Sequence, residues 1–289
     1  MNVQSWFAGA AAAAALGLAA PAFAQAPAQP SPAQPTYAAS DWIKVDPQNL
    51  LVIDTTKGRI VVEMVPAFAP DHIERIKTLT RAGFYDGLQF FRVIDDFMAQ
   101  TGDKANTGAG TPEYSMMKGA FSFRRGPETP FAGARDAKGD TFGFVGPVPV
   151  KTQPDALMPL MADGKVKATG TFCPGVAGMA RAGDPDSAST QFFLMRQANT
   201  MLDDRYTPWG RVLVGLDVVR AIAPGEPPQN PDSMTKVQIA ADMPEADRPD
   251  VWRVDPTSAA FRAAMTAAVS ARGADFTPCD VEVPAEVRK

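Results

Sequence analysis

Short runs of apolar residues, separated by glycine, proline and small polar residues, recur along most of the chain. Residues 50–66, LLVIDTTKGRIVVEMVP, contain two such runs that meet at Lys57-Gly58, and this pattern predicts a β-hairpin. Residues 89–94 alternate between the two faces of a strand, and residues 235–241, TKVQIAA, predict a further strand. The pattern therefore indicates a protein made mainly of short strands.

Two segments show apolar residues at helical spacing instead. In residues 69–87, isoleucine and leucine recur on one face between an opening proline and a closing glycine. Residues 216–222 predict a second, short helix that ends before Pro224. Many strands, together with two helices far apart in the sequence, fit an antiparallel β-barrel covered by two α-helices.

Composition narrows the class of protein. The chain has 289 residues, of which 45% are hydrophobic and 21% charged, as expected for a globular protein with one large domain or two small ones. Its net charge of −4 and its pI of about 5.1 give no indication of nucleic-acid binding. The 27 prolines and 23 glycines favour strands and loops over a helical bundle.

The N-terminal pattern is typical of an exported protein. An apolar run over residues 6–20 precedes a small-x-small cleavage pattern at residues 22–24. We interpret residues 1–24 as a signal peptide cut after Ala24, which leaves no membrane span and predicts a periplasmic or secreted protein. An uncleaved anchor is the alternative, because no lysine or arginine precedes the run. Residues 25–47 are then a tether rich in proline and alanine, and we expect residues 25–39 of it to be extended and unfolded.

The cysteines and the single histidine limit the available side-chain chemistry. Export makes disulfides possible, and we predict a bond between Cys173 in the barrel and Cys279 near the C-terminus. Two buried free thiols are the alternative. Two cysteines and one histidine without close spacing do not make a zinc site. We expect His72 on the surface near the start of its helix, and nothing supports a histidine-based catalytic triad.

The stretch FFRVIDDFMAQTGD, residues 90–103, places an arginine among aromatic and aliphatic residues. Strand alternation puts Arg92 on the face opposite to its neighbours Phe91 and Val93. Taken alone, this pattern favours a solvent-directed or salt-bridged arginine, with the two aspartates at 95–96 nearby. The rest of the chain changes that interpretation.

Three segments that are far apart in the sequence are informative when they are considered together. They are FYDGLQFFRVIDDFMAQTGD at 84–103, GVAGMARAGDPDSASTQFFLM at 175–195 and MLDDRYTPWGRVLVGLDVVRAI at 201–222. In this order they resemble the signature motifs of the cyclophilin-type peptidyl-prolyl cis–trans isomerases, and the resemblance covers residues 48–243. It implies a mainly β fold, a closed eight-stranded antiparallel β-barrel with two covering α-helices and a substrate groove on its outer face.

The resemblance also implies roles for residues of all three segments. By motif position, Arg92 corresponds to the catalytic arginine. Leu202, Tyr206 and Trp209 correspond to residues that line the proline pocket. Substrates are then proline-containing polypeptides, no cofactor is implied, and we expect a monomer. The other positions that match substrate-binding residues are Phe97, Met98, Gln100, Ala180, Gln191 and Phe193, with Arg181 and Met201 at the groove edge.

The chemistry of proline isomerisation suits these residue types. An X–Pro bond isomerises slowly because amide resonance must be broken, with a barrier of about 20 kcal/mol. No bond is made or cleaved, so neither a nucleophile nor a metal is needed. An apolar wall holds the proline ring, and a guanidinium that donates to the prolyl nitrogen weakens the resonance by preorganised electrostatics. We therefore expect Arg92 to face a groove.

Two departures from the family pattern bear on what the groove binds. Arg181 stands where an asparagine is frequent, and its positive charge at the groove edge predicts a preference for acidic segments. Met201 stands where the family commonly has an aromatic residue, which helps to hold the cyclic-peptide inhibitor cyclosporin.

Two segments exceed what a minimal family member would have. Residues 112–168 are an insertion with a β-rich run and a short helix, which either shapes the groove and recruits clients or is passive. Residues 244–289 are a C-terminal extension with an N-capped amphipathic helix that carries Phe261, Met265 and Val269 on one side. We expect this helix to pack on the barrel.

Two functions follow from these observations. The first is an exported isomerase that accelerates X–Pro isomerisation during the folding of envelope or periplasmic proteins. The alternative is an envelope chaperone or peptide-binding module on the same barrel, with weak or no isomerase activity. The intact set around Arg92 favours the first, and the insertion and the altered groove edge favour the second.

Overall fold

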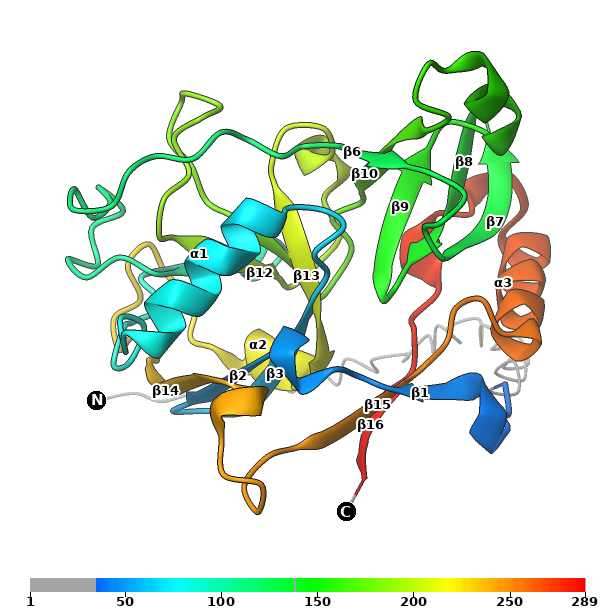
Figure 1. The fold of residues 1–289 in the computed structure, drawn as a ribbon. Helices are drawn as coiled ribbons and strands as arrows, with labels where there is room; N and C mark the ends of the chain where they lie inside the picture. The colour runs from blue at the N-terminus through cyan, green and yellow to red at the C-terminus, as the bar shows by residue number, and fades with distance from the viewer. Residues whose placement is uncertain (1–34, 138, 289) are drawn as a thin grey trace, which may run out of the picture. The chain divides into compact units, whose positions relative to one another are not determined.

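The computed structural model describes residues 35–137 and 139–288, so the expected signal peptide at 1–24 and the first part of the tether lie outside the described residues. Short antiparallel strands are the main regular secondary structure of the described chain, as its pattern predicts (Figure 1). The largest sheet has eight strands in the order β14-β2-β3-β13-β11-β12-β5-β4. They are β2 (Leu50–Thr55), β3 (Gly58–Met64), β4 (Arg92–Val93), β5 (Met98–Thr101), β11 (Val176–Met179), β12 (Phe192–Met195), β13 (Pro208–Val214) and β14 (Met234–Ile239).

The eight-stranded sheet curls around the main hydrophobic core. The backbone N–H of Gly87 donates to the Met234 carbonyl at 2.6 Å, and that of Phe90 to the Asp232 carbonyl at 2.9 Å. These bonds join the segment before β4 to the start of β14, so the two edges of the sheet meet. All eight strands contribute buried apolar side chains to the enclosed core. The mainly β fold with an antiparallel eight-stranded sheet is thus confirmed.

Two helices cover this sheet, also as predicted. The helix α1 (Pro70–Arg81) packs against β13 and β14, and α2 (Leu216–Ala221) packs against β3. The expectation of a surface histidine on α1 is wrong, because His72 is only 2% exposed. It lies four residues before Ile76 and seven before Leu79, which puts it on the same buried face of the helix. Burial lowers the pKa of His72.

The insertion has a sheet of its own, which confirms its predicted β-rich run. This inserted sheet has five antiparallel strands in the order β6-β10-β9-β8-β7 (Figure 1). Val145, Val148 and Val150 from β8 and β9 are buried in the same core as the eight-stranded sheet, so the inserted sheet is anchored to it. Its strands are β6 (Phe123–Arg125), β7 (Phe131–Ala137), β8 (Asp140–Val145), β9 (Val148–Thr152) and β10 (Val166–Gly170), with a 3₁₀ helix at Asp155–Leu160.

The tether predicted at residues 25–47 reaches too far, because a strand forms within it. The strand β1 (Trp42–Lys44) pairs with β15 (Asp250–Val254), and β15 pairs with β16 (Ala285–Arg288) in a three-stranded sheet. Residues 42–44 therefore belong to a folded unit with the C-terminal extension. Tyr37 and Trp42 explain why, since their aromatic rings pack against a hydrophobic cluster of that extension.

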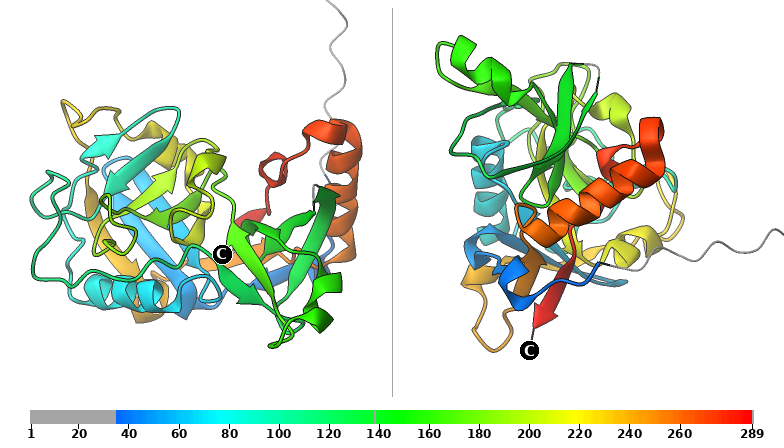
Figure 2. Two further views of the ribbon diagram at one scale, coloured as in Figure 1. Left: turned by 90° about the horizontal axis from the view of Figure 1, so that it is seen from above. Right: turned by 90° about the vertical axis from the view of Figure 1, so that its right-hand side faces the viewer.

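The predicted C-terminal helix exists, but it packs elsewhere than expected. The helix α3 (Ala259–Arg272) begins after Ser258, whose hydroxyl accepts the backbone N–H of Phe261. Its buried residues Phe261 and Met265 meet the inserted sheet, where the rings of Phe261 and Phe144 contact edge to face at 5.4 Å. Figure 2 shows α3 beside the strands of the inserted sheet. The expected packing on the barrel is therefore wrong, because the inserted sheet supplies the apolar partner.

The predicted disulfide between Cys173 and Cys279 is present. The two Cα atoms lie 5.1 Å apart, and 106 residues separate the two positions in the chain. Cys173 is fully buried just before β11, and Cys279 follows α3. The bond therefore ties the C-terminal extension to the eight-stranded sheet.

Candidate active site

Arg92 lies in a row of residues that crosses four neighbouring strands. In the ladder, Arg92 on β4 is opposite Gln100 on β5, Gln100 is opposite Phe193 on β12, and Phe193 is opposite Gly178 on β11. Directly opposed residues of adjacent strands project from the same face of a sheet. The arginine, the glutamine and the phenylalanine therefore share one face, which is the outer one, since Ala99 and Phe192 on the other face lie in the enclosed core.

Side-chain amides support the guanidinium of Arg92 along this row. Its Nη1 donates to Gln100 Oε1 at 3.4 Å. Gln100 Nε2 in turn donates to Gln191 Oε1 at 2.9 Å, and Gln191 Nε2 donates to the Gly108 carbonyl at 3.2 Å. The predicted residues Arg92, Gln100 and Gln191 are thus brought together in one chain of hydrogen bonds. The Arg92 side chain keeps 39% of its surface exposed, so it remains accessible from solvent.

A second contact of Arg92 comes from a residue that the sequence pattern did not indicate. Arg92 Nε donates to Glu226 Oε2 at 2.6 Å. Backbone hydrogen bonds in both directions between Val93 and Gly225, each 2.8 Å long, set the register that brings Glu226 beside Arg92. Of the two aspartates suspected as partners, Asp95 pairs instead with Arg196 at 2.7 Å. Arg92 and Glu226 are 134 positions apart in the sequence, so no local sequence pattern predicts their contact.

Next to this network a cluster of apolar side chains lies on the same face of the sheet. Phe193 contacts the rings of Phe172 and Tyr206, with centroids 5.7 and 5.9 Å away. Gly178 makes room for the rings of Phe193 and Phe172, because a Cβ there would lie 2.6 Å from the first ring and 2.7 Å from the second. The cluster brings together six predicted residues, with Phe172 and Gly178 as additions that the motifs did not single out. The six are Phe97, Met98, Ala180, Phe193, Leu202 and Tyr206.

The edge of the pocket carries Arg181 and Met201, as the motif positions imply. The guanidinium of Arg181 stacks 4.4 Å from the ring centroid of Tyr206, and its Nε donates to the Arg205 carbonyl at 3.0 Å. The Met201 side chain is 73% exposed, and it follows a turn in which the Asn199 side chain accepts its backbone N–H. Arg181 is therefore held in place at the edge, whereas Met201 offers an exposed, flexible side chain.

One predicted pocket residue lies elsewhere. Trp209 on β13 is fully buried in the core that the eight-stranded sheet encloses. Its ring packs at right angles to Phe192 with centroids 5.6 Å apart. The expectation that Trp209 lines the proline pocket is therefore wrong, because the alternation of β13 turns this position inward.

The arrangement places the guanidinium of Arg92 beside an apolar cluster on the same face of the sheet. A proline ring packed against this cluster would bring its preceding amide next to the guanidinium of Arg92, where a donor can stabilise a twisted amide. Among residues 35–137 and 139–288, no three His, Cys, Asp or Glu side chains gather closely enough to hold a metal ion.

Comparisons with known proteins point to one family. Residues 50–241 match the family described as cyclophilin type peptidyl-prolyl cis-trans isomerase. The chain is 33% identical over 202 residues to a "Probable peptidyl-prolyl cis-trans isomerase" of Brucella suis, across 68% of this chain and 85% of that protein. It is 28% identical over 170 residues to "Peptidyl-prolyl cis-trans isomerase-like 1" of Homo sapiens, across 59% of this chain and 76% of that protein.

A solved structure is similar over more of the chain. The crystal structure of cyclophilin AquaCyp293 from Hirschia baltica superimposes with a TM-score of 0.78 and 35% sequence identity. The likeness covers 87% of this chain and 98% of that one. This is a larger share than residues 50–241 represent, so the similarity extends beyond the segment that matches the family.

Proposed function

The chain belongs to the cyclophilin-type peptidyl-prolyl cis–trans isomerase family, and on this premise we propose that it accelerates X–Pro isomerisation during the folding of exported proteins. It is a peptidyl-prolyl cis–trans isomerase, and its substrates are proline-containing polypeptides. The observation that carries the assignment of the site is the row from Arg92 through Gln100 to Phe193 on one face of the sheet. This row supports the proposal because the donor and the apolar cluster that would take the proline ring lie on neighbouring strands.

In the proposed reaction the protein holds a substrate and makes or breaks no covalent bond. The apolar pocket around Phe193 takes the proline ring, and the free N–H groups of Arg92 donate to the prolyl nitrogen of the twisted amide. Gln100 keeps the guanidinium oriented through its 3.4 Å contact with Nη1. The stabilisation is electrostatic and preorganised, because the guanidinium is held before substrate arrives.

Two observations support a role outside the cytoplasm. The first is the N-terminal pattern of an apolar run followed by a small-x-small site. The second is the disulfide between Cys173 and Cys279, because such bonds form and persist in oxidising compartments. We therefore propose a periplasmic or secreted location.

An alternative function is a chaperone or peptide-binding module with weak isomerase activity. The observation that favours it is the exposure of large apolar side chains, since Met116, Leu160 and Met201 are each at least 70% exposed. Flexible exposed methionines suit promiscuous contacts with apolar segments. The intact Arg92 network makes the isomerase the preferred function.

A refolding experiment tests the proposed role, combined with analysis of the protein recovered from its producing cells. We expect the full-length protein to accelerate the slow, proline-limited refolding phase of an exported client in the absence of protease. N-terminal sequencing should find a mature chain that starts at Gln25 in the periplasm or the medium. A protein that stays uncleaved in the cytoplasm and leaves the slow phase unchanged would contradict the proposal.

A further inference from the structure

The inserted sheet contacts the loop at residues 200–207, which carries Leu202 and Tyr206 of the proline pocket. The carboxylate of Asp204 lies 3.1 Å from Lys151 Nζ and 2.8 Å from Lys167 Nζ. Lys151 is on β9 and Lys167 on β10, which are neighbouring strands of the inserted sheet. The Asp204 carboxylate, in the loop at residues 200–207, therefore forms ion pairs with two ammonium groups of the insertion. We call residues 200–207 the pocket loop.

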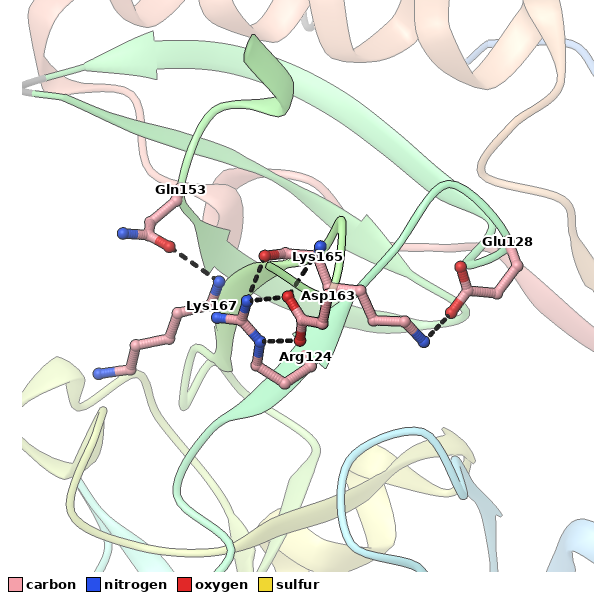
Figure 3. Close-up of polar contacts among 6 residues, drawn as sticks. All are labelled: Arg124, Glu128, Gln153, Asp163, Lys165 and Lys167. Atoms are coloured by element: carbon pink, nitrogen blue, oxygen red, sulfur yellow. Dashed lines mark hydrogen bonds and ion pairs between the residues drawn. The ribbon is translucent and has the colours of Figure 1, made fainter. Parts of the chain in front are cut away.

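Polar contacts within the inserted sheet fix the backbone around Lys167 (Figure 3). Its backbone N–H donates to Gln153 Oε1 at 2.9 Å. Arg124 pairs with Asp163 through two hydrogen bonds of 3.0 and 2.6 Å and also donates to the Lys165 carbonyl. In Figure 3 the side chain of Lys167 extends away from the other five labelled residues. Its ammonium group is thus directed outward from a fixed strand, toward Asp204.

The backbone conformation of Asp204 determines the direction of the chain in the pocket loop. It has a left-handed backbone conformation with φ of 59°, which few residue types other than glycine, asparagine and aspartate adopt readily. The two residues that follow, Arg205 and Tyr206, both donate their backbone N–H to the Leu202 carbonyl at 3.1 Å. Ion pairs that fix the position of Asp204 therefore also limit the motion of the turn that contains Leu202 and Tyr206.

Asp204 is held in its charged form, which favours its ion pairs with Lys151 and Lys167. Partial burial alone would raise the pKa of Asp204, but hydrogen bonds from Lys167 and Lys151 outweigh this effect and hold the pKa below its usual range. The insertion touches the same loop a second time, where the Ala120 backbone N–H donates to Thr207 Oγ1 at 2.9 Å. Two separate parts of the insertion, the lysines on β9 and β10 and the backbone at Ala120, thus contact the pocket loop.

We propose that Lys151 and Lys167 are positioning residues that act through Asp204 to hold the edge of the proline pocket, so that the insertion sets how tightly the enzyme binds its substrate. The inference deepens the proposed function and rests on the assignment of the pocket to the proline ring. It answers the open question about residues 112–168 in favour of a segment that shapes the groove.

The test compares charge-removing variants of the full-length protein. Lys151→Gln combined with Lys167→Gln removes the two cations, and Asp204→Asn removes the anion while keeping a residue that tolerates the left-handed conformation. Lys165→Gln is the matched control, because Lys165, just before β10, pairs with Glu128 instead of Asp204 (Figure 3). The readouts are kcat and KM for a short X–Pro peptide by NMR exchange, and amide hydrogen exchange of Arg205 and Tyr206.

We expect KM to rise roughly fivefold in the lysine double variant and in Asp204→Asn, with kcat changed less than about twofold, because ion pairs of this exposure are individually modest. Amide exchange at Arg205 and Tyr206 should accelerate in both variants and stay unchanged in Lys165→Gln. Combining all three changes should add nothing to the effect of the lysine pair, since the groups act as one unit.

Two results would overturn the inference in distinguishable ways. If calorimetric titration detects peptide binding to the wild-type protein, but KM and amide exchange in the variants match those of Lys165→Gln, only the positioning role is wrong. If the wild-type protein binds no X–Pro peptide at all, the proposed function is wrong and this inference is lost with it.

Discussion

The guanidinium of Arg92 is held from its Nε side by the carboxylate of Glu226, at 2.6 Å. On the other side, Nη1 reaches Gln100. Within the described part of the chain these contacts engage two of the five N–H groups of the guanidinium, which leaves the others for a substrate. The orientation of Arg92 therefore depends on two elements that are far apart in the sequence.

Removing the Glu226 carboxylate should loosen Arg92. We expect Glu226→Ala to lower kcat/KM roughly threefold, because the contact is partly exposed and such pairs are worth at most about 1 kcal/mol. Glu226→Gln keeps an oxygen that accepts from Nε and should retain most of the activity. Asp54→Asn, which breaks an ion pair with Arg59 of similar exposure on the β2–β3 hairpin, is the control. Higher activity in Glu226→Ala would show instead that the carboxylate competes with substrate for Arg92.

The disulfide should contribute strongly to stability. The bond closes a loop between positions 106 residues apart, and in the chain-entropy model its reduction costs up to about 5 kcal/mol of unfolding free energy. Urea unfolding of the protein with and without reductant measures this difference. Alkylation of the unreduced, denatured protein provides the check, since two reactive thiols would contradict the bond.

Local sequence patterns predict the strands, the helices and the site residues within the motifs. Contacts between segments far apart in the sequence determine the features that these patterns do not predict. The alternation around Arg92 and the motif order correctly placed it beside Gln100 and Phe193. Glu226 was missed because its contact with Arg92 spans 134 residues and depends on backbone register. Trp209 was misplaced because its motif position says nothing about which face of β13 it occupies. The folding of the tether, likewise, depends on pairing of β1 with β15 near the other end of the chain.

Asp203 should make the stability fall as pH rises through the weakly acidic range. Burial raises its pKa to about 6 from an ordinary 3.8, and a bond from the Phe172 backbone N–H offsets only part of this effect. Between these two values the folded protein binds a proton that the unfolded chain has released, so unfolding free energy is lost as pH increases. The loss is up to about 3 kcal/mol at 1.36 kcal/mol per unit.

Asp203→Asn should abolish this component of the pH dependence. Urea unfolding at several values between pH 4 and pH 7 measures it, as the difference between wild type and variant, because other carboxylates with lowered pKa change stability in the opposite direction. Parallel pH profiles of the two proteins would show that Asp203 carries no such penalty.

Cyclosporin should bind weakly. Family members with an aromatic residue at the position of Met201 use it to hold the inhibitor, through a ring hydrogen bond and packing. Met201 has no such donor and is 73% exposed, so at least about 1 kcal/mol of binding free energy is absent. Met201→Trp should tighten binding in calorimetric titrations. Nanomolar binding by the wild-type protein would contradict this prediction.

The isomerisation rate of a short X–Pro peptide, measured by NMR exchange for wild type and Arg92→Ala, tests the central claim most directly. Loss of one preorganised donor should lower kcat/KM roughly a hundredfold, about 3 kcal/mol, and Arg92→Lys should also be impaired because a mobile ammonium cannot reproduce the planar fork. Circular dichroism should show an unchanged fold, since the side chain lies outside the core. A folded Arg92→Ala protein with undiminished activity would contradict the assignment of Arg92 as the catalytic residue.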